Sequence, residues 1–166
     1  MIRTMREADL HAVLAVQAAC YPPAMQEASG VLLARLRTAP GTVLVACDAA
    51  GVCAYLFAYP SRLGAVTPLG AGFAPAPDAD TLYIHDLAVA PRVHGQGLAR
   101  RLVASLLDAN QALPWSALVA VQDSRRFWEG QGFAVQDAGE EGARRLATYP
   151  EGALYMSRGA DRPALR

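Results

Sequence analysis

The spacing of hydrophobic residues predicts four helices. Leu10, Val13, Leu14 and Gln17 follow the helical repeat, and this helix is expected to end before Tyr21-Pro22-Pro23. A second helix is predicted over residues 27–37 and a third, amphipathic helix over residues 98–110. A short helix is predicted over residues 124–131, where Gly130 and Gly132 would end it.

Runs rich in β-branched and apolar residues predict the strands of a sheet. They cover residues 2–5, 42–48, 52–59, 81–90, 115–121, 133–136 and 152–157. The second and third of these runs are separated by a turn at Ala50-Gly51 and form a predicted hairpin. Residues 64–80 are crowded with Gly, Pro and Ala, which favours an irregular loop over one face of the domain.

Helices and strands are mixed along the chain, with an N-terminal hairpin followed by a strand-helix-strand-helix unit. This order predicts an α+β fold, with a mixed central sheet of about six to seven strands and helices on both faces. The chain has 166 residues, a length typical of one domain that buries its own core without disulfides.

Composition narrows the class of protein further. Fifteen basic and fifteen acidic residues cancel, so the chain lacks the broad positive field expected for nucleic-acid or anionic-membrane binding. No stretch is long and apolar enough for a membrane span, and the N-terminus lacks a signal-peptide pattern. Three cysteines without a CxxC pair fit a reducing compartment. We therefore expect a cytoplasmic protein with a small-molecule partner, no nucleic acid and no membrane.

One glycine-rich segment has a context that suggests chemistry. Gly-x-Gly occurs three times in the chain, but only Gly95-Gln-Gly97 lies between an apolar strand and a helix. Glycines let successive N–H groups turn inward, and a helix N-terminus adds partial positive charge, so the segment predicts a phosphate cradle. Arg92 and Arg100 would add full charges. No GK[ST] follows, which excludes a P-loop, and Arg100 breaks the dinucleotide-binding GxGxxG pattern.

Two segments resemble a known family. Arg92-Val-His-Gly-Gln-Gly97, after the strand Leu87-Ala-Val89, resembles the Arg-x-x-Gly-x-Gly signature of the GCN5-related N-acetyltransferases (GNAT). The segment DSRRFWEGQGF, which ends at Phe133, is similar to the family's helix that closes with an aromatic pair and Gly-Phe. The order of elements also matches. The resemblance implies a GNAT fold in a single acetyltransferase domain over residues 1–158, with residues 159–166 as a C-terminal tail.

The resemblance also implies how acetyl-CoA binds. Its diphosphate would lie against the loop amides, its pantetheine arm would pair with the backbone of the preceding strand, and the second motif would form a wall. No metal is expected. The implied cofactor-binding residues are Leu87, Ala88, Val89, Arg92, Val93, His94, Gly95, Gln96, Gly97, Leu98, Ala99, Arg100, Ser124, Phe127 and Trp128.

The implied reaction is attack of a neutral amine on the thioester carbonyl. A lysine-like amine, with a pKa of about 10.4, is almost fully protonated at neutral pH, so a base is needed. His85 and Asp86 stand where several amine acetyltransferases of the family carry acidic residues, and they are the candidate catalytic residues. Strict alternation places them on opposite faces of the strand, so both reach the thioester only if the strand bulges. Otherwise one of them is structural.

One position departs from the family pattern. Trp128 stands where the family often has a tyrosine that acts as general acid, and an indole cannot supply this proton. Loss of the acid is tolerable because a thiol with a pKa of about 8.5 leaves readily as thiolate. Tyr149 or Tyr155 would substitute, unless they only pack in the fold. Arg125 and Arg126 would meet the ribose phosphate or remain in solvent.

These observations predict an N-acetyltransferase that moves an acetyl group from acetyl-CoA to a primary amine of a small molecule or peptide. Trp128 motivates an alternative, a noncatalytic acyl-CoA-binding sensor, and transfer of a longer acyl chain is a third hypothesis. The family selects its acceptor through loops, here residues 21–27 and 64–80, which carry few acidic residues and so disfavour polyamines. Many relatives are dimers, so a homodimer is possible.

Overall fold

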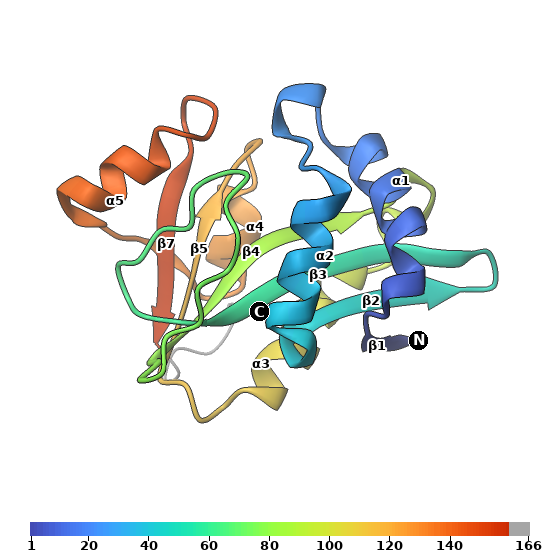
Figure 1. The fold of residues 1–166 in the computed structure, drawn as a ribbon, viewed down its shortest axis with the longest axis horizontal. Helices are drawn as coiled ribbons and strands as arrows, with labels where there is room; N and C mark the ends of the chain where they lie inside the picture. Colours follow the sequence, from blue (N-terminus) through green and yellow to red (C-terminus); the bar gives the residue numbers. More distant parts are fainter. Residues whose placement is uncertain (160–166) are drawn as a thin grey trace.

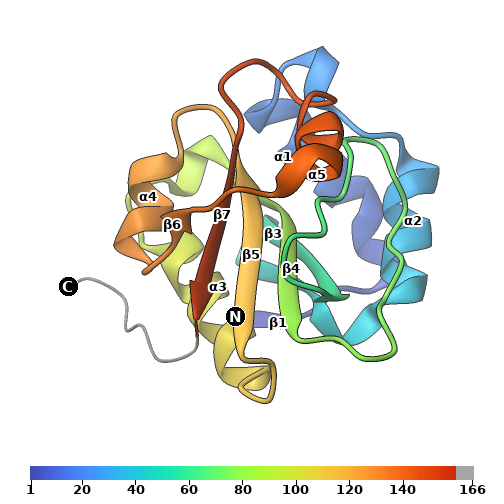
Figure 2. The ribbon, with the colours of Figure 1, turned by 90° about the vertical axis from the view of Figure 1, so that its left-hand side faces the viewer.

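The computed structural model describes residues 1–159, which form one seven-stranded mixed sheet with helices on both faces (Figures 1 and 2). This confirms the predicted α+β class and strand number. The strands are β1 (Ile2–Thr4), β2 (Val43–Asp48), β3 (Gly51–Ser61), β4 (Thr81–Val89), β5 (Trp115–Ala120), β6 (Ala134–Val135) and β7 (Leu154–Gly159). The helices are α1 (Leu10–Cys20), α2 (Ser29–Thr38), α3 (Leu98–Ala109), α4 (Arg125–Gly130) and α5 (Gly139–Leu146). Short 3-10 turns cover Glu7–Asp9, Pro23–Met25, Pro40–Thr42 and Pro91–Val93.

The sheet has the order β1-β2-β3-β4-β5-β7-β6. Strands β1 to β4 are antiparallel neighbours, and α3 crosses over to place β5 parallel to β4. Helices α1 and α2 lie on one side of the sheet, whereas α3 and α4 lie on the other (Figure 2). Only the first residue of the predicted tail, Gly159, is described, and it belongs to β7. Residues 160–166 lie outside the described part of the chain. The boundary of the domain stays a prediction.

Strand β4 separates from β5 halfway along its length. Their parallel pairing begins at Thr81 and Trp115 and ends at Ile84 and Leu118, although β4 continues to Val89. At the same point the pairing with β3 shifts, because Phe57 pairs with Asp86 while Ala58 pairs with Ile84. The strand therefore bulges at the residue between these two, which is His85.

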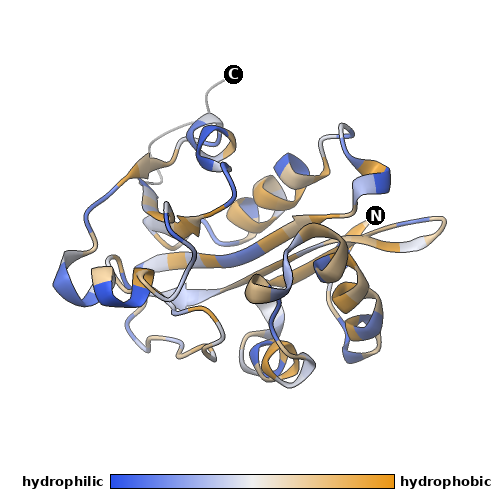
Figure 3. Cartoon of the chain, turned by 90° about the horizontal axis from the view of Figure 1, so that it is seen from above, coloured by the Kyte–Doolittle hydropathy of each residue, from blue (hydrophilic) through white to orange (hydrophobic). Residues whose placement is uncertain are grey.

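The core lies between the sheet and its two helical layers. Helix α3 buries Leu102, Val103 and Leu106 on its inner face and leaves charged residues outside. Figure 3 shows that the helices carry both hydrophobic and hydrophilic residues. This is expected for a helix that packs one of its faces against a sheet and exposes the other to solvent. Burial of these apolar side chains holds the loop before α3 against the end of β4.

Two helices differ from the sequence predictions, and β7 covers Leu154–Gly159 rather than residues 152–157. Helix α2 starts at Ser29 rather than at residue 27, because the backbone of Glu27 exchanges two hydrogen bonds with the side chain of Gln17. Helix α5 was not predicted, since its sequence has almost no apolar repeat. It has acidic residues in its first turn and arginines in its last, an arrangement that favours a helix through its dipole and through the Arg145–Glu141 pair at 2.8 Å.

Within residues 1–159, no helix is long and apolar enough to cross a membrane. Over the same residues, no three His, Cys, Asp or Glu side chains gather in a way that could hold a metal ion.

Candidate functional site

A cleft of about 210 Å³ opens where β4 and β5 separate. Strand β4 forms one wall, and β5 with α4 forms the other. Of the predicted site residues it brings together His85, Asp86, Leu87, Val89, Ala99, Ser124, Phe127 and Trp128. The other lining residues are Tyr21, Ile84, Leu118, Val119, Val121 and Gln122. Ala88 is buried and does not line the cleft.

The edge of β4 that faces the cleft carries backbone groups without a strand partner. Ala90 donates its N–H to the Cys53 carbonyl of β3, at 2.8 Å, so alternation turns the backbone of Leu87 and Val89 away from β3. Pairing with β5 has already ended at Ile84. The amides of Leu87 and Val89 therefore point to the cleft side and offer an extended ligand a strand to pair with.

The glycine loop lies at the end of this edge. Gly95 and Gly97 have φ of 82° and 73°, a left-handed conformation that favours glycine, and Gly97 caps the N-terminus of α3. A Cβ at either glycine would meet no atom within 4 Å, so the space beside them is open. Ala99, in the first turn of α3, lines the cleft, whereas residues 91–98 do not, so the loop lies next to the cleft through its connection to Ala99. The open amides and the helix N-terminus suit an anion.

The arginines of the loop are arranged differently from one another. Arg92 forms a bidentate ion pair with Asp48, which lies beside the β2–β3 turn. The guanidinium of Arg92 is therefore already paired with a carboxylate. Arg100 is exposed and has no ion pair within the described residues.

The other predicted loop residues have different surroundings. His94 contacts the Val89 carbonyl through Nε2 at 2.8 Å, and Val93 is buried in the core. Gln96 is exposed, and Leu98 is half-buried.

The second predicted motif forms the opposite wall. Phe127 and Trp128 line the cleft, with their rings 4.9 Å apart in an edge-to-face arrangement. Trp128 is only 6% exposed and also packs on Phe133, so it serves the core as well as the wall. The preceding residues Gln122 and Asp123 both have positive φ, of 51° and 58°, a strained turn of the kind that gathers at functional sites.

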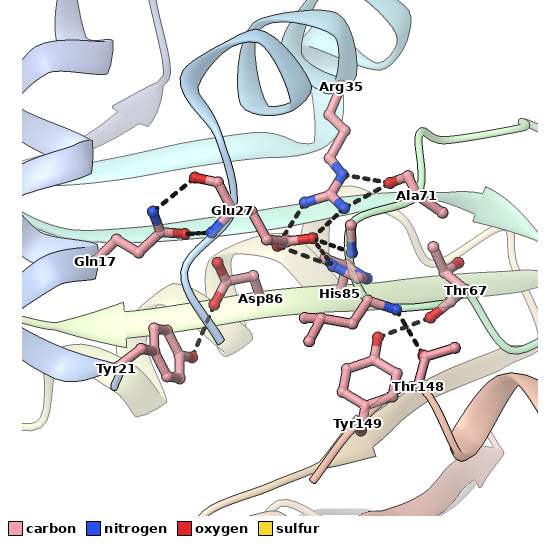
Figure 4. A network of polar contacts seen from close by, with 12 residues as sticks. Gln17, Tyr21, Glu27, Arg35, Thr67, Ala71, His85, Asp86, Thr148 and Tyr149 are labelled. Atoms are coloured by element: carbon pink, nitrogen blue, oxygen red, sulfur yellow. Dashed lines mark hydrogen bonds and ion pairs between the residues drawn. The ribbon is translucent and has the colours of Figure 1, made fainter. Parts of the chain in front are cut away.

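His85, at the bulge, points into a buried polar network (Figure 4). Its Nε2 lies 3.3 Å and 3.4 Å from the two carboxylate oxygens of Glu27, and its side chain is 1% exposed. Its Nδ1 is buried and has no hydrogen-bond partner in the described residues. His85 lines both the main cleft and a small cavity of about 20 Å³ behind it. One ring nitrogen is thus anchored by Glu27, and the other is buried without a hydrogen-bond partner among the described residues.

Glu27 carries a negative charge in this network. Burial opposes its ionisation, yet hydrogen bonds from Arg35 and His85 outweigh burial and hold the pKa of the carboxyl well below its usual range. Arg35 binds both carboxylate oxygens, at 2.7 Å and 2.5 Å, and its side chain is fully buried. The network therefore contains a compensated pair of buried charges next to the histidine.

Asp86 is held by tyrosines. Tyr21 donates to Oδ1 at 2.8 Å and Tyr55 donates to Oδ2 at 2.9 Å, so each oxygen already has a partner. Burial raises the pKa of the Asp86 carboxyl above its usual value. The tyrosine OH of Tyr21 also lies 3.1 Å from the Leu87 carbonyl. Asp86 and the two tyrosines therefore support the strand through hydrogen bonds. Tyr21 also lines the cleft.

The two tyrosines expected as substitutes for the family's acid lie elsewhere. Tyr149 donates to the Thr67 carbonyl at 2.7 Å and lines the small cavity but not the main cleft. Tyr155 accepts the N–H of Gly64 at 2.8 Å and lines neither space. Tyr21 is therefore the tyrosine of the described residues that lines the main cleft.

Sequence reasoning missed Glu27, Arg35 and Tyr21 as individual site residues, although residues 21–27 were assigned to acceptor choice. A signal for Arg35 was present. It lies three residues after Leu32 and one before Leu36, on the stripe of α2 that faces the core. An arginine on an apolar stripe indicates a buried charge that needs an acid, but the sequence does not identify which acid.

Comparisons with known proteins show the family and the fold of this chain. The model of the acetyltransferase (GNAT) family matches residues 9–133. The GphF GNAT-like decarboxylase in complex with isobutyryl-CoA is 18% identical, with a TM-score of 0.79 over 96% of this chain and 99% of that chain. The loading GNATL domain of CurA from Lyngbya majuscula is 11% identical, with a TM-score of 0.75 over 96% and 97%.

The ribosomal-protein-S18-alanine N-acetyltransferase from Escherichia coli is 15% identical, with a TM-score of 0.68 over 96% of this chain and 93% of that chain. At these identities the solved structures show a shared fold. No curated protein matches the sequence. Because the family model spans most of the chain and includes both motifs, this protein belongs to the GNAT family of acetyltransferases.

Proposed function

We propose that the protein transfers an acetyl group from acetyl-CoA to a primary amine of a small molecule or peptide. The observation that carries this proposal is the meeting of three features at one cleft. They are the unpaired edge of β4, the open glycine loop before α3, and a buried histidine with a free ring nitrogen. Together they supply a place for the donor and a base for the acceptor.

The residues of the cleft fit coenzyme A. The N–H of Val89 pairs with the extended pantetheine arm, and the loop amides of residues 95–97 bind the diphosphate. Arg100 is the exposed arginine next to this loop that has no ion pair among the described residues, so it adds charge where Arg92 does not. Phe127 and Trp128 form the wall. The bound acetyl-CoA supplies the thioester carbonyl that the amine attacks.

His85 acts as the base in this proposal. Its free Nδ1 accepts the proton that the amine loses as it forms the new C–N bond. The N–H of Leu87 donates to the thioester oxygen, whose negative charge grows during the attack. Asp86 holds Tyr21 in the cleft by accepting the hydrogen bond of its hydroxyl, so the sulfur departs without a proton from Tyr21, as a thiol with a pKa of about 8.5 allows. The C–S bond then breaks and the thiolate leaves.

The test is an amine panel with acetyl-CoA as the donor. Small primary amines and peptides with different N-termini are incubated with the protein, and thiol release and acetylated product are both measured. Acetylation of at least one member above the no-enzyme rate supports the proposal. Coenzyme A binding without turnover of any member would contradict it and would support the noncatalytic sensor. Replacing acetyl-CoA by longer acyl donors decides which acyl group is preferred.

A second candidate function follows from the small space behind His85. That cavity, of about 20 Å³, has room for about one water molecule and not for an organic amine. A reaction within the acyl-CoA itself would need no acceptor there. GphF, which is similar to this chain over its whole length, is a GNAT-like decarboxylase. In the candidate reaction an acyl-CoA with a carboxylate on its α-carbon loses CO₂, and the electron pair passes to the thioester as an enolate.

Protonation of the enolate at its α-carbon by the imidazolium of His85 completes that reaction. Incubation of malonyl-CoA in D₂O tests it. Formation of acetyl-CoA with one deuterium, together with release of CO₂, supports decarboxylation. Intact malonyl-CoA after incubation, with acetylation of an amine in the panel, leaves the acetyltransferase as the function.

A further inference from the structure

The pair formed by Glu27 and Arg35 is deeply buried. The two side chains are 4% and 0% exposed. Burying two charges costs a large desolvation free energy, and such a pair is often no more stabilising than apolar residues of the same volume. The chain nevertheless places this pair beside His85 (Figure 4). Stability therefore gives no sufficient account of the pair.

The hydrogen-bond inventory fixes which nitrogen of His85 carries the proton. An ionised carboxylate only accepts hydrogen bonds, and Glu27 is held ionised by Arg35. The Nε2 of His85, which faces both carboxylate oxygens, must therefore donate. In the neutral imidazole the proton is then on Nε2, and the lone pair is on Nδ1, the atom without a partner.

Glu27 has no capacity to act as the base itself. Arg35 contacts both of its oxygens, and the N–H of Gly70 donates to Oε2 at 2.7 Å. With its pKa held well below the usual range, the carboxylate has no tendency to take a proton at neutral pH. Its contact with the reaction runs only through His85.

The same pair ties the irregular loop of residues 64–80 to the histidine. Arg35 donates through Nε and one terminal nitrogen to the Ala71 carbonyl, at 3.0 Å and 2.5 Å. Phe73 lies under the guanidinium of Arg35 and packs edge-on against the ring of His85. The loop expected to choose the acceptor is thus fastened to the group that orients the base.

We propose that Glu27 is a positioning residue that holds His85 in its Nε2-protonated tautomer with Nδ1 free toward the acceptor, and that Arg35 keeps Glu27 ionised for this role. This inference rests on the proposed function for the use of Nδ1. The position of the ring proton is a property of the protein alone and is measured without turnover.

The experiment measures ¹⁵N and ¹H resonances of the histidine rings in the full chain, with the His85 signals assigned from His85→Gln. At a pH where the ring is neutral, we expect the proton on Nε2 and no proton on Nδ1. We also expect the Nε2 proton to exchange slowly with water, because it is buried and bound to a carboxylate. A proton on Nδ1 would overturn the proposal whether or not the protein turns over substrate.

The matched variants separate positioning from stability. Glu27→Gln leaves Arg35 buried without its partner and can fail to fold, so Glu27→Met with Arg35→Met removes both charges together. The exposed pair Glu7–Arg37, which also ends on α2, gives the control Glu7→Gln with Arg37→Gln. In the Met double variant the slowly exchanging Nε2 proton is lost, and in the control it stays.

Turnover in the same variants completes the test. We expect kcat to fall about 100-fold in the Met double variant, at the low end of what a positioned base contributes, with the KM for acetyl-CoA unchanged. A thermal melt verifies that the variant is folded. An unchanged Nε2 proton, or an unchanged kcat in a folded variant of an active enzyme, would overturn the positioning role. An inactive wild-type protein with the expected Nε2 proton would refute the proposed function and leave the tautomer assignment standing.

Discussion

At the residue scale, the site depends on how a bulge orients two neighbours in one strand. His85 and Asp86 are adjacent, and with the bulge at His85 both line the main cleft and the small cavity, although their hydrogen-bond partners differ. Two tyrosine hydroxyls occupy the oxygens of Asp86, whereas His85 keeps one nitrogen without a partner. We therefore propose that His85 transfers the proton and that Asp86 supports the strand.

Replacing His85 by Gln is expected to lower kcat by about 10²- to 10⁴-fold, because a positioned base typically contributes this much. Coenzyme A binding should stay within a factor of two to three, about the resolution of a titration, since its contacts are to the backbone. Steady-state kinetics and calorimetry check both parts. His11→Gln, an exposed histidine of α1, is the control and should change neither quantity. Equal kcat in the two variants would remove His85 from the mechanism.

The sequence predicts His85 and Asp86 as catalytic candidates, which stays a prediction, but it does not predict the different hydrogen bonds that the two side chains form. Adjacent positions in a strand alternate by default, and the bulge that His85 introduces depends on pairing with β3. Likewise, Glu27 meets His85 from a segment far away in the chain. Such contacts follow from the packing of α2 on the sheet, which local patterns do not encode.

At the scale of elements, the cleft arises because β4 extends beyond the last of its residues that pairs with β5. Strand β4 continues past its last pair with β5, and the glycine loop turns directly into α3. The strand, the glycine turn and the helix were predictable from the apolar run, the Pro91 stop and the amphipathic repeat. The divergence of β4 and β5 was not, because it depends on the register between strands.

Gly97→Ala tests the loop. Alanine at a φ of 73° is strained by roughly 1 kcal/mol, and its methyl group enters the open space beside the amides. We expect coenzyme A affinity to fall at least about tenfold, which is 1.4 kcal/mol, measured by calorimetry. Gly139→Ala is the matched control, because Gly139 has a φ of 75°, has open space beside it and starts α5. The Gly139→Ala variant should lose a similar amount of stability and no affinity for coenzyme A. An equal loss of affinity in both variants would contradict the proposal that the loop before α3 binds the diphosphate.

At the scale of the whole molecule, buried charges couple stability to pH. The pKa of Glu27 is held below its ordinary value of 4.5, so the unfolded chain binds this proton more tightly than the native protein does. The stabilisation is complete above that value and is lost as the pH falls below it. Asp86 acts in the opposite direction, because its raised pKa favours the native state at low pH and this contribution is lost as the pH rises.

The double variant Glu27→Met with Arg35→Met should therefore be less sensitive to acid. We expect its free energy of unfolding to fall less than that of the wild type between about pH 5 and about pH 3, by up to about 1.4 kcal/mol per pH unit. Urea unfolding at several pH values measures this. The Glu7→Gln with Arg37→Gln variant breaks an exposed pair, and because solvent screens the effect of Arg37 on the pKa of Glu7, its acid slope should change much less than that of the Met variant. Parallel slopes for wild type and the Met variant would show that Glu27 is not the source.

The central claim, that coenzyme A lies between the edge of β4 and the loop before α3, is tested most directly by mapping backbone amide resonances while coenzyme A is added. The account predicts that the largest shifts fall on Leu87, Val89 and the amides of residues 93–98. The surface between the end of α3 and β7, lined by Leu107, Asn110 and Ser116, should not respond. Shifts concentrated on that surface, or none at saturating coenzyme A, would contradict the account.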